Sequence, residues 1–349
     1  MIEWQRLHGR HTLPWQNTRD PYRVWLSEIM LQQTQVSTVL AYFERFLQRF
    51  ADVRALAAAP LDDVLALWSG LGYYSRARNL HRCAQAVVTE HGGQFPRSSV
   101  VLATLPGIGR STAAAIAAFC FGERVAILDG NVKRVLTRVL GFGGDLAEAA
   151  QERALWEQAT RLLPEDGIER YTQGLMDLGA TLCSARTPRC DVCPLHADCV
   201  AHRQGHPQRY PVKTRKIKRG ARRNAMLWLT DAQGRVWLTQ REATGVWAGL
   251  WTLPLFDSLD ALRALTASWP GDGHALTAID HALTHFDWRL EPWRHTLGAR
   301  LSGVRRAAIE AALPAGAWFT HEHAQAVALP APIRKLLTAP DLSGRGELR

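Results

Sequence analysis

The run Leu105-Pro106-Gly107-Ile108-Gly109-Arg110-Ser111-Thr112-Ala113 sets the architecture of the N-terminal half of the chain. Its two glycines permit a tight turn, and the alanine-rich segment 111–121 that follows is typical of a helix. The run therefore predicts two helices joined by a hairpin. Backbone amides at the start of the second helix point outward and attract an anion such as a phosphate. A plain connection between two helices is the alternative, so Gly107, Gly109 and Ser111 are candidate phosphate-binding residues.

Helical patterns extend on both sides of this run. Apolar residues recur at three- and four-residue intervals between Val36 and Phe50. Further helices are expected between Pro60 and Gly70, from Ser75 to Gly92, and from the candidate N-cap Asp129 to Leu140. Strand signals are scarce in this half, which is therefore predicted to be all-α.

A basic segment separates this half from the rest. Eight Lys or Arg residues fall between Arg209 and Arg223, while no Asp or Glu occurs between Asp198 and Asp231. Such a segment is typical of a solvated linker at a domain boundary. We expect a helical domain over residues 1–203, a linker over 204–223, a second domain over 224–340 and a tail over 341–349.

Beyond the boundary the apolar pattern becomes strand-like. Strands are predicted at 226–230 and 236–241, joined by the turn at 231–234, and again at 283–290 and 296–301. A helix is predicted between Ser258 and Trp269. The second half is therefore expected to be a small α+β domain.

The composition of the chain limits its class of structure, its location and its kind of binding partner. The chain has 349 residues, of which 47% are apolar and 21% charged, so wholesale disorder is excluded. No apolar stretch approaches the roughly 20 residues of a membrane span, and the N-terminus has no secretory signal, so a cytoplasmic location is expected. The formal net charge of +10 favours nucleic acid over a membrane surface as the partner.

Four of the six cysteines lie close together, at Cys183, Cys190, Cys193 and Cys199. In a chain without a secretory signal disulfides are disfavoured, and four thiolates can surround one metal centre. Zinc and a [4Fe–4S] cluster both accept four thiolates, and the spacing alone does not separate them. Because other candidate catalytic groups lie far away in the sequence, a structural role is favoured over redox catalysis.

Two carboxylates are candidate catalytic groups. Glu28, Gln32 and Gln35 lie within about 60° of one another on a helix, and uncharged amides suit a surface that meets bases. A lone carboxylate in a semi-apolar cleft has a raised pKa and can act as a general acid. An ordinary exposed helix face is the alternative for this stripe. Asp129 is an N-cap candidate that could also face a cleft.

Together these motifs resemble the helix-hairpin-helix DNA glycosylases with an iron–sulfur cluster, the endonuclease III superfamily, and within it the adenine-specific MutY type. The matching runs span residues 13–199 almost continuously. They are Leu13-Pro14-Trp15, Trp25-Leu26-Ser27-Glu28, Met30-Leu31-Gln32-Gln33-Thr34-Gln35-Val36, Gly70-Leu71-Gly72-Tyr73-Tyr74, the hairpin, Leu128-Asp129-Gly130-Asn131-Val132-Lys133-Arg134 and the four cysteines. The resemblance implies one [4Fe–4S] cluster on Cys183, Cys190, Cys193 and Cys199 rather than zinc.

The resemblance also implies a reaction, the hydrolysis of the N-glycosidic bond of adenine mispaired with 8-oxoguanine or guanine in double-stranded DNA, by a monomer. Glu28 would protonate the adenine so that it leaves neutral, and Asp129 would stabilise the oxocarbenium-like sugar. The adenine must first leave the stack. Tyr73 and Gln32 or Gln33 match side chains that fill or wedge the opened duplex.

Ser111 bears on the subtype. Bifunctional relatives carry a lysine at this hairpin position, which forms a Schiff base and cleaves the strand. A serine hydroxyl cannot form an imine, so a monofunctional glycosylase is expected. Lys133 lies nearby in the sequence and is at most a weak trap for the product.

The second half resembles, more loosely, the Nudix-like domain of the same superfamily. A working Nudix hydrolase needs a cluster of glutamates for magnesium, whereas the segment 250–265 holds only Asp257 and Asp260, which disfavours pyrophosphate hydrolysis. In the family a Phe-Ser-His loop reads 8-oxoguanine. Here the aligned run is Leu283-Thr284-His285, so lesion recognition is expected from Thr284 and His285, with Leu283 in place of the aromatic residue.

Three other functions are disfavoured by particular residues. Ser111 argues against a bifunctional lyase, and the pairing of Glu28 with Asp129 argues against a DNA-binding module without catalysis. The missing carboxylates argue against a Nudix hydrolase.

Overall fold

The structure is a computed structural model that describes residues 1–214 and 218–338. The described residues form two compact units: residues 1–58 with 79–214, and residues 59–78 with 218–338. The predicted tail at 341–349 lies outside the described residues.

The first unit is helical, and residues 1–214 contain no strand in the structure, as predicted. Its helices are α1 (Ile2–His8), α2 (Pro21–Leu31), α3 (Val36–Arg49), α4 (Val53–Ala58), most of α6 (Ser75–His91), α7 (Ser99–Leu102), α8 (Arg110–Phe121), α9 (Gly130–Leu140), α10 (Ala149–Arg161), α11 (Ile168–Thr181) and α12 (Val200–Arg203), with short 3-10 helices at Cys190–Val192 and Pro207–Arg209.

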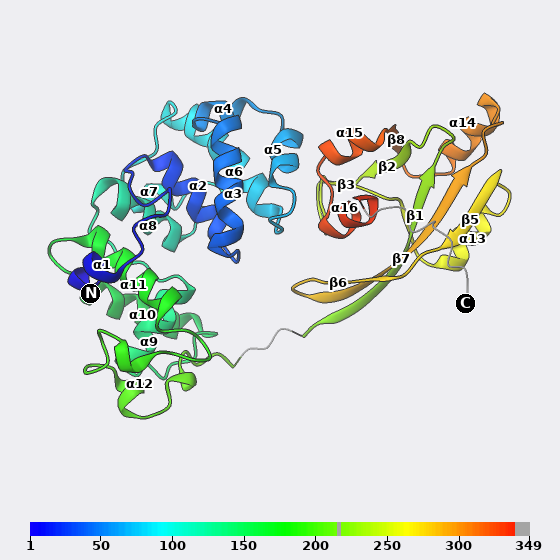
Figure 1. The fold of residues 1–349 in the computed structure, drawn as a ribbon. Coiled ribbons are helices and arrows are strands. Elements are labelled where there is room, and N and C mark those ends of the chain that lie inside the picture. Colours follow the sequence, from blue (N-terminus) through cyan, green and yellow to red (C-terminus); the bar gives the residue numbers. More distant parts are fainter. Residues whose placement is uncertain (215–217, 339–349) are drawn as a thin grey trace. The chain divides into compact units, whose positions relative to one another are not determined.

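Helix α8, the second helix of the hairpin, connects two groups of helices. It packs against α2, which in turn contacts α3, and it also contacts α11, which packs against α9. The apolar side chains of Trp25, Leu26 and Met30 on α2 are completely buried. Helix α1 lies beside α11 (Figure 1). The space bordered by α2, α8 and α11 is therefore enclosed by elements from both groups.

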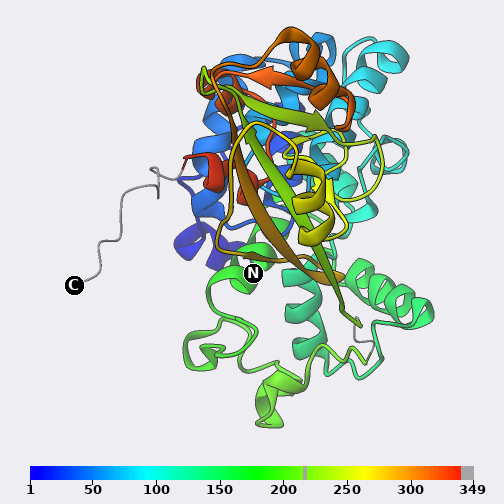
Figure 2. The ribbon, with the colours of Figure 1, turned by 90° about the vertical axis from the view of Figure 1, so that its right-hand side faces the viewer.

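The second unit contains α5 (Leu61–Trp68) and a mixed sheet with four helices. The strands are β1 (Gly220–Thr230), β2 (Val236–Gln240), β3 (Trp251–Thr252), β4 (Leu255–Phe256), β5 (Gly271–Ala275), β6 (Ile279–Ala282), β7 (Phe286–Leu297) and β8 (Gly316–Phe319), and the helices are α13 (Leu259–Thr266), α14 (Gly303–Ala311), α15 (His321–Ala326) and α16 (Ala331–Thr338). The main strand order is β3-β2-β1-β7-β5. Strands β1 and β7 run parallel as the two long central strands (Figure 2).

Helices cover both faces of this sheet, which confirms the predicted α+β class. Ala225, Leu227 and Leu229, alternate residues of β1, are buried in one apolar core with residues of α13 and α14. Trp228 and Thr230 point to the opposite face and line a hollow with residues of α15 and α16.

The strands predicted at 283–290 and 296–301 were placed wrongly. One continuous strand, β7, runs from Phe286 to Leu297, and Leu283 precedes it in the turn that follows β6. Pro292 does not interrupt the strand. Its carbonyl accepts the Leu276 N–H, so its missing N–H faces the same side, away from β1, and the pairing with β1 is kept.

The ends of the predicted linker at 204–223 also differ in the structure. Strand β1 begins at Gly220. Closer to the helical unit, the carbonyl of Val212 accepts the Leu146 N–H at 3.0 Å. The N–H of Thr214 donates to Asp145 Oδ1 at 3.2 Å. Both ends of the basic segment therefore belong to folded units.

No helix in the described part of the chain is long and apolar enough to cross a membrane.

Candidate active site

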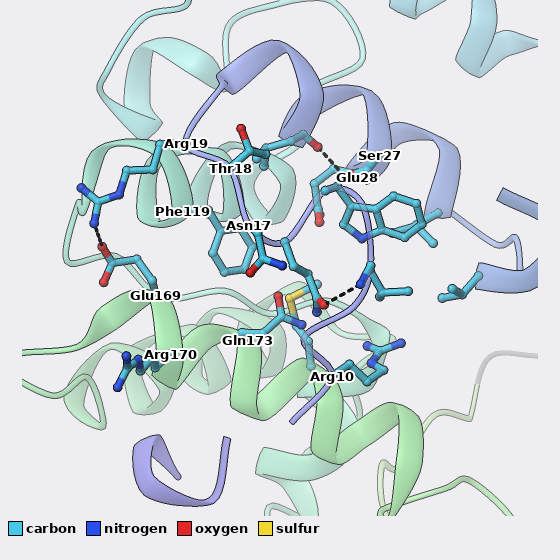
Figure 3. A pocket seen from close by; sticks show the side chains of 17 residues that line it. Arg10, Asn17, Thr18, Arg19, Ser27, Glu28, Phe119, Glu169, Arg170 and Gln173 are labelled. Atoms are coloured by element: carbon cyan, nitrogen blue, oxygen red, sulfur yellow. Dashed lines mark hydrogen bonds and ion pairs between the residues drawn. The ribbon is translucent and has the colours of Figure 1, made fainter. Parts of the chain in front are cut away.

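A pocket of about 560 Å³ opens where α2, α8 and α11 meet the loop that follows α1. Figure 3 shows side chains from these elements turned toward the same hollow. The lining residues are Arg10, Leu13, Trp15, Gln16, Asn17, Thr18, Arg19, Val24, Ser27, Glu28, Leu31, Val36, Phe119, Glu169, Arg170, Gln173 and Met176. The pocket therefore combines apolar walls with a few polar groups, as small-molecule sites do.

Glu28 lies in this pocket, on α2, and is half-buried. Its carboxyl group has no hydrogen bond or ion pair with any residue that the structure describes. Burial, and to a smaller extent the negative charge of Asp129, raises the pKa of Glu28 to about 8. At neutral pH this carboxyl group is therefore mostly protonated and can donate a proton.

Asp129 caps the N-terminus of α9, which confirms the predicted capping role. Its Oδ1 accepts the Val132 N–H at 2.7 Å. Burial raises the pKa of Asp129 even though the backbone N–H groups of Val132 and Asn131 and two basic neighbours act to lower it. Asp129 is not among the residues that line the pocket, but its charge acts on Glu28, so the two carboxyl groups lie within electrostatic reach of each other.

Ser111 connects the hairpin to the segment that carries Asp129. Its Oγ accepts the Leu128 N–H at 3.0 Å. The Ser111 hydroxyl oxygen thus has an internal donor, Leu128, which directly precedes Asp129 in the chain, and contact of Ser111 with DNA stays a prediction.

The two hairpin glycines have different reasons to be glycine. Gly107 has φ +76°, and a Cβ there would lie 2.6 Å from Asn79 Cβ. Gly109, the residue that precedes α8, has φ −83°, and a Cβ there would meet no atom within 4 Å. Nothing in the described chain requires Gly109 to lack a side chain, which leaves the start of α8 open to close approach by another molecule.

Lys133 forms an ion pair with Glu152. Its ammonium group is therefore held by a carboxylate on α10.

The predicted stripe of Glu28, Gln32 and Gln35 does not lie on one helix. Helix α2 ends at Leu31, Gln32 is the residue that follows it, and Gln35 precedes the first residue of α3. The helix stops because the chain turns at Gln33, which has φ +57°. Only Glu28 of this set projects from a helix.

Gln33 and Tyr73, both predicted to contact DNA, have strained backbones. Three non-glycine residues in the described chain have positive φ, and these are two of them, at +57° and +50°. Both side chains are exposed, Tyr73 by 47%. Such strain costs on the order of 1–3 kcal/mol and is concentrated at functional sites.

Two amides in the pocket were missed by the sequence analysis. The Gln16 Nε2 group is buried and has no hydrogen-bond partner in the described chain. Gln173, on α11, donates from Nε2 to Asp177 Oδ1 at 2.9 Å, while no described donor reaches its Oε1. Gln16 directly follows the Leu13-Pro14-Trp15 run, so its position beside this motif could have indicated a site residue. No motif in the sequence indicates that Gln173 belongs to the pocket.

The four cysteines line one small cavity of about 20 Å³ together with apolar residues, two arginines and two histidines. Arg138 of α9 is buried beside them, and its Nη1 donates to Cys183 Sγ at 3.3 Å and to Ser184 O at 2.7 Å. Arg134 donates from Nε to Cys183 O at 2.8 Å. No set of three His, Cys, Asp or Glu side chains in the described residues is arranged around a single metal ion. Four cysteine side chains around one cavity are nevertheless the donor set that a four-thiolate metal site requires.

In the second unit, Thr284 and His285 form the exposed tip between β6 and β7. The turn is closed by Leu283 N–H, which donates to Phe286 O at 2.9 Å, and Leu283 is partly buried. On α13, Asp260 is exposed and lies 3.8 Å from Arg263. The described residues therefore offer no carboxylate cluster for magnesium on this helix.

Comparisons with known proteins agree with this arrangement. Residues 26–161 match the HhH-GPD superfamily of base excision DNA repair proteins, and residues 225–339 match the NUDIX domain family. The adenine DNA glycosylase of Buchnera aphidicola (from Schizaphis graminum) is 33% identical over 97% of this chain and 96% of its own length. The rat adenine DNA glycosylase is 43% identical over 58% of this chain and 41% of its own length.

Among solved structures, a thermostable thymine-DNA glycosylase is 28% identical, with a TM-score of 0.52, over 58% of this chain and 93% of its own. The helical unit thus has the fold of this superfamily, and the second unit is Nudix-like. With matches that span nearly the whole chain, the protein belongs to the adenine DNA glycosylase family, base-excision-repair enzymes that hydrolyse N-glycosidic bonds.

Proposed function

We propose that the chain is a monofunctional glycosylase that acts, as a monomer, on adenine opposite 8-oxoguanine or guanine in double-stranded DNA. The observation that carries this proposal is the pair of carboxyl groups. Glu28 has no partner in its pocket and a pKa raised to about 8, and Asp129 lies within electrostatic reach of it.

The two carboxyl groups match the two charges that the reaction develops. Adenine is a poor leaving group as an anion, and a proton from Glu28 lets it leave neutral. The deoxyribose then approaches an oxocarbenium ion, which an ionised Asp129 stabilises. Because the capping bond from Val132 occupies one oxygen, Asp129 is held in place before the substrate arrives.

The unpartnered amides support adenine as the base. The Gln16 Nε2 group is a donor without a partner in the described chain and Gln173 Oε1 is an acceptor, and both residues line the pocket with Glu28. Adenine presents ring nitrogens as acceptors and a 6-amino group as donor. The pocket therefore offers complementary partners to a flipped adenine.

The residues near the hairpin support a monofunctional enzyme. Ser111 offers no amine, and its hydroxyl already accepts the Leu128 N–H. The nearest lysine in sequence, Lys133, is paired with Glu152. Among the residues that the structure describes near the hairpin, neither Ser111 nor Lys133 thus offers a free amine for an imine with the sugar, which supports a monofunctional enzyme.

Other residues support the binding and opening of double-stranded DNA. The open start of α8 at Gly109 suits a DNA phosphate. Gln33 and Tyr73 are suited to wedge the opened base stack, because both are exposed and held in strained backbone conformations. Gln32, which adjoins Gln33 in the same turn, is proposed to act with them. Thr284 and His285, at the tip of the β6–β7 turn, offer a hydroxyl and an imidazole to the Hoogsteen edge of 8-oxoguanine.

We further propose that Cys183, Cys190, Cys193 and Cys199 would hold one [4Fe–4S] cluster. The cluster would brace the loop that packs on α9, the helix that Asp129 caps. Arg138 would place a positive charge beside the cluster, since its Nη1 already reaches Cys183 Sγ.

A cleavage assay tests this function. Duplexes that differ only in the mispair are incubated with the enzyme, with and without alkali. We expect adenine to be released when it lies opposite 8-oxoguanine and when it lies opposite guanine. The strand should break at the abasic site only after alkali. Strand breaks without alkali would show a lyase, and intact duplexes after alkali would contradict the proposed substrates.

A further inference from the structure

Asp177 is a buried carboxylate that borders the pocket without lining it. Its side chain is 1% exposed, and it follows Gln173 by one turn of α11. Three N–H groups converge on it. Arg10 donates its backbone N–H to Oδ2 at 3.0 Å and its Nε–H to Oδ1 at 2.6 Å, and Gln173 donates from Nε2 to Oδ1 at 2.9 Å.

This arrangement decides which end of the Gln173 amide faces the pocket. The oxygen and nitrogen of a glutamine amide have nearly the same shape, so the hydrogen-bond network fixes their orientation. An ionised carboxylate can only accept hydrogen bonds. Since both oxygens of Asp177 receive N–H donors, the amide group of Gln173 must turn its NH2 toward Asp177. Its Oε1 is left for the pocket, where it has no described donor.

We propose that Asp177 is a positioning residue that makes the pocket select a 6-amino purine over a 6-oxo purine. The proposal rests on the function proposed above, because it assumes that a flipped purine occupies the pocket with Glu28. The amino group of adenine donates to Gln173 Oε1. Hypoxanthine and guanine carry an acceptor oxygen at the same place, and two acceptors face each other.

Rejection arises because the amide cannot turn to suit the wrong base. A free glutamine would rotate by half a turn and donate its NH2 to a 6-oxo group. Here that rotation would place Oε1 against Asp177 Oδ1 and break the bond from Nε2. Arg10 strengthens the restraint, since its two N–H groups hold both oxygens of Asp177.

The variant Asp177→Asn removes this restraint with little change in shape. An asparagine has one acceptor and one donor end, so it cannot accept from all three N–H groups. In one orientation its NH2 takes the place of Oδ2 and faces the Arg10 backbone N–H, while its oxygen still accepts from Gln173. In the other its NH2 takes the place of Oδ1 and faces Arg10 Nε–H and Gln173, whose Oε1 then turns toward it and whose NH2 turns to the pocket. Each orientation opposes one N–H of Arg10, so the asparagine can turn over and the direction of the Gln173 amide is no longer fixed.

The experiment compares single-turnover rates on two duplexes that carry adenine or hypoxanthine opposite 8-oxoguanine. The wild type, Asp177→Asn, Gln173→Leu and the double variant are measured. We expect the wild type to prefer adenine. The adenine-to-hypoxanthine ratio should fall by about 10- to 100-fold in Asp177→Asn, the range for one misdirected hydrogen bond. Gln173→Leu should show a comparable fall, and the double variant should match Gln173→Leu. The intrinsic difference between the two leaving groups cancels between variants.

The outcomes separate this inference from the function on which it rests. If Asp177→Asn slows both substrates by the same factor and leaves the ratio unchanged, Asp177 only braces α11 and the inference is overturned. If Asp177→Asn does not fold, the adenine-to-hypoxanthine ratio of Gln173→Leu tests the inference instead. An amide that is free to rotate serves both bases, so an unchanged ratio in Gln173→Leu would overturn the inference as well. If the wild type releases neither base, the proposed function fails first and the inference fails with it.

Discussion

Replacing Glu28 by Gln should abolish adenine release and at the same time stabilise the protein against unfolding at neutral pH. A neutral amide cannot donate the proton, and loss of a general acid typically lowers the rate by about 10²–10⁴-fold. Binding to the mispair should persist, because the amide keeps the shape of the side chain and the contacts to phosphates are unchanged.

The gain in stability follows from the raised pKa. The pKa of Glu28 rises from an ordinary 4.5 to about 8 on folding. Between these values the folded protein binds a proton that the unfolded chain releases, so stability falls as the pH rises through this window. Each pH unit well inside the window costs about 1.4 kcal/mol. The wild type should therefore lose about 2.5 kcal/mol relative to Glu28→Gln between about pH 5.5 and about pH 7.5.

Anaerobic urea unfolding of both proteins at these two pH values measures that difference. Comparing the two pH values removes the pH-independent cost of burying an amide in place of a carboxylic acid. Glu169→Gln is a matched control, because Glu169 lines the same pocket but lies 3.4 Å from Arg19 in an ion pair. A gain for Glu28→Gln that does not grow with pH, or near-normal excision by this variant, would refute the reasoning.

Three further predictions concern other residues. Asp129→Asn should slow excision by about 10²–10³-fold through lost charge stabilisation while the protein stays folded, because Asn caps helices as well as Asp; unfolding on circular dichroism would show that capping is the main role. The anaerobically purified protein should be yellow-brown with about four irons and four labile sulfides per chain, and Cys193→Ala should lower the soluble yield; a colourless protein with stoichiometric zinc would contradict this. Replacing Thr284 and His285 together by Ala should reduce the preference in binding for 8-oxoguanine over guanine opposite adenine by about 5- to 150-fold, the value of one polar base contact; an equal ratio in both proteins would place lesion reading elsewhere.

The sequence predicted those features that depend on local residue types. The glycines of the hairpin, the capping role of Asp129 and the all-α first half follow from turn and helix preferences, which are short-range. Glu28 stood out because it was the lone acid in an amide-rich stretch. The prediction failed where the backbone departs from its preference. Gln32 and Gln33 are acceptable helix formers, and nothing in their side chains announces the turn at φ +57° that ends α2.

The polar lining of the pocket could not be predicted for a different reason. Gln173 is separated from Glu28 by most of the helical unit in sequence and reaches the same pocket only through the packing of α8 against α2 and α11. The direction of its amide depends on Asp177 and, through it, on Arg10. Such long-range polar networks leave no periodic pattern in a single sequence.

The hydrogen bond from Leu128 to Ser111 bears on how strand-cleaving and purely hydrolytic glycosylases can diverge. Leu128 is 2% exposed, and Ser111 Oγ is the acceptor for its N–H. A lysine at this position, as strand-cleaving relatives carry, has no acceptor to offer. The substitution would leave a buried amide without a partner, at a cost of about 1–3 kcal/mol. A lineage that acquired the lysine would thus begin with a less stable loop beneath Asp129, and a second change that gives Leu128 a new acceptor would be favoured soon after.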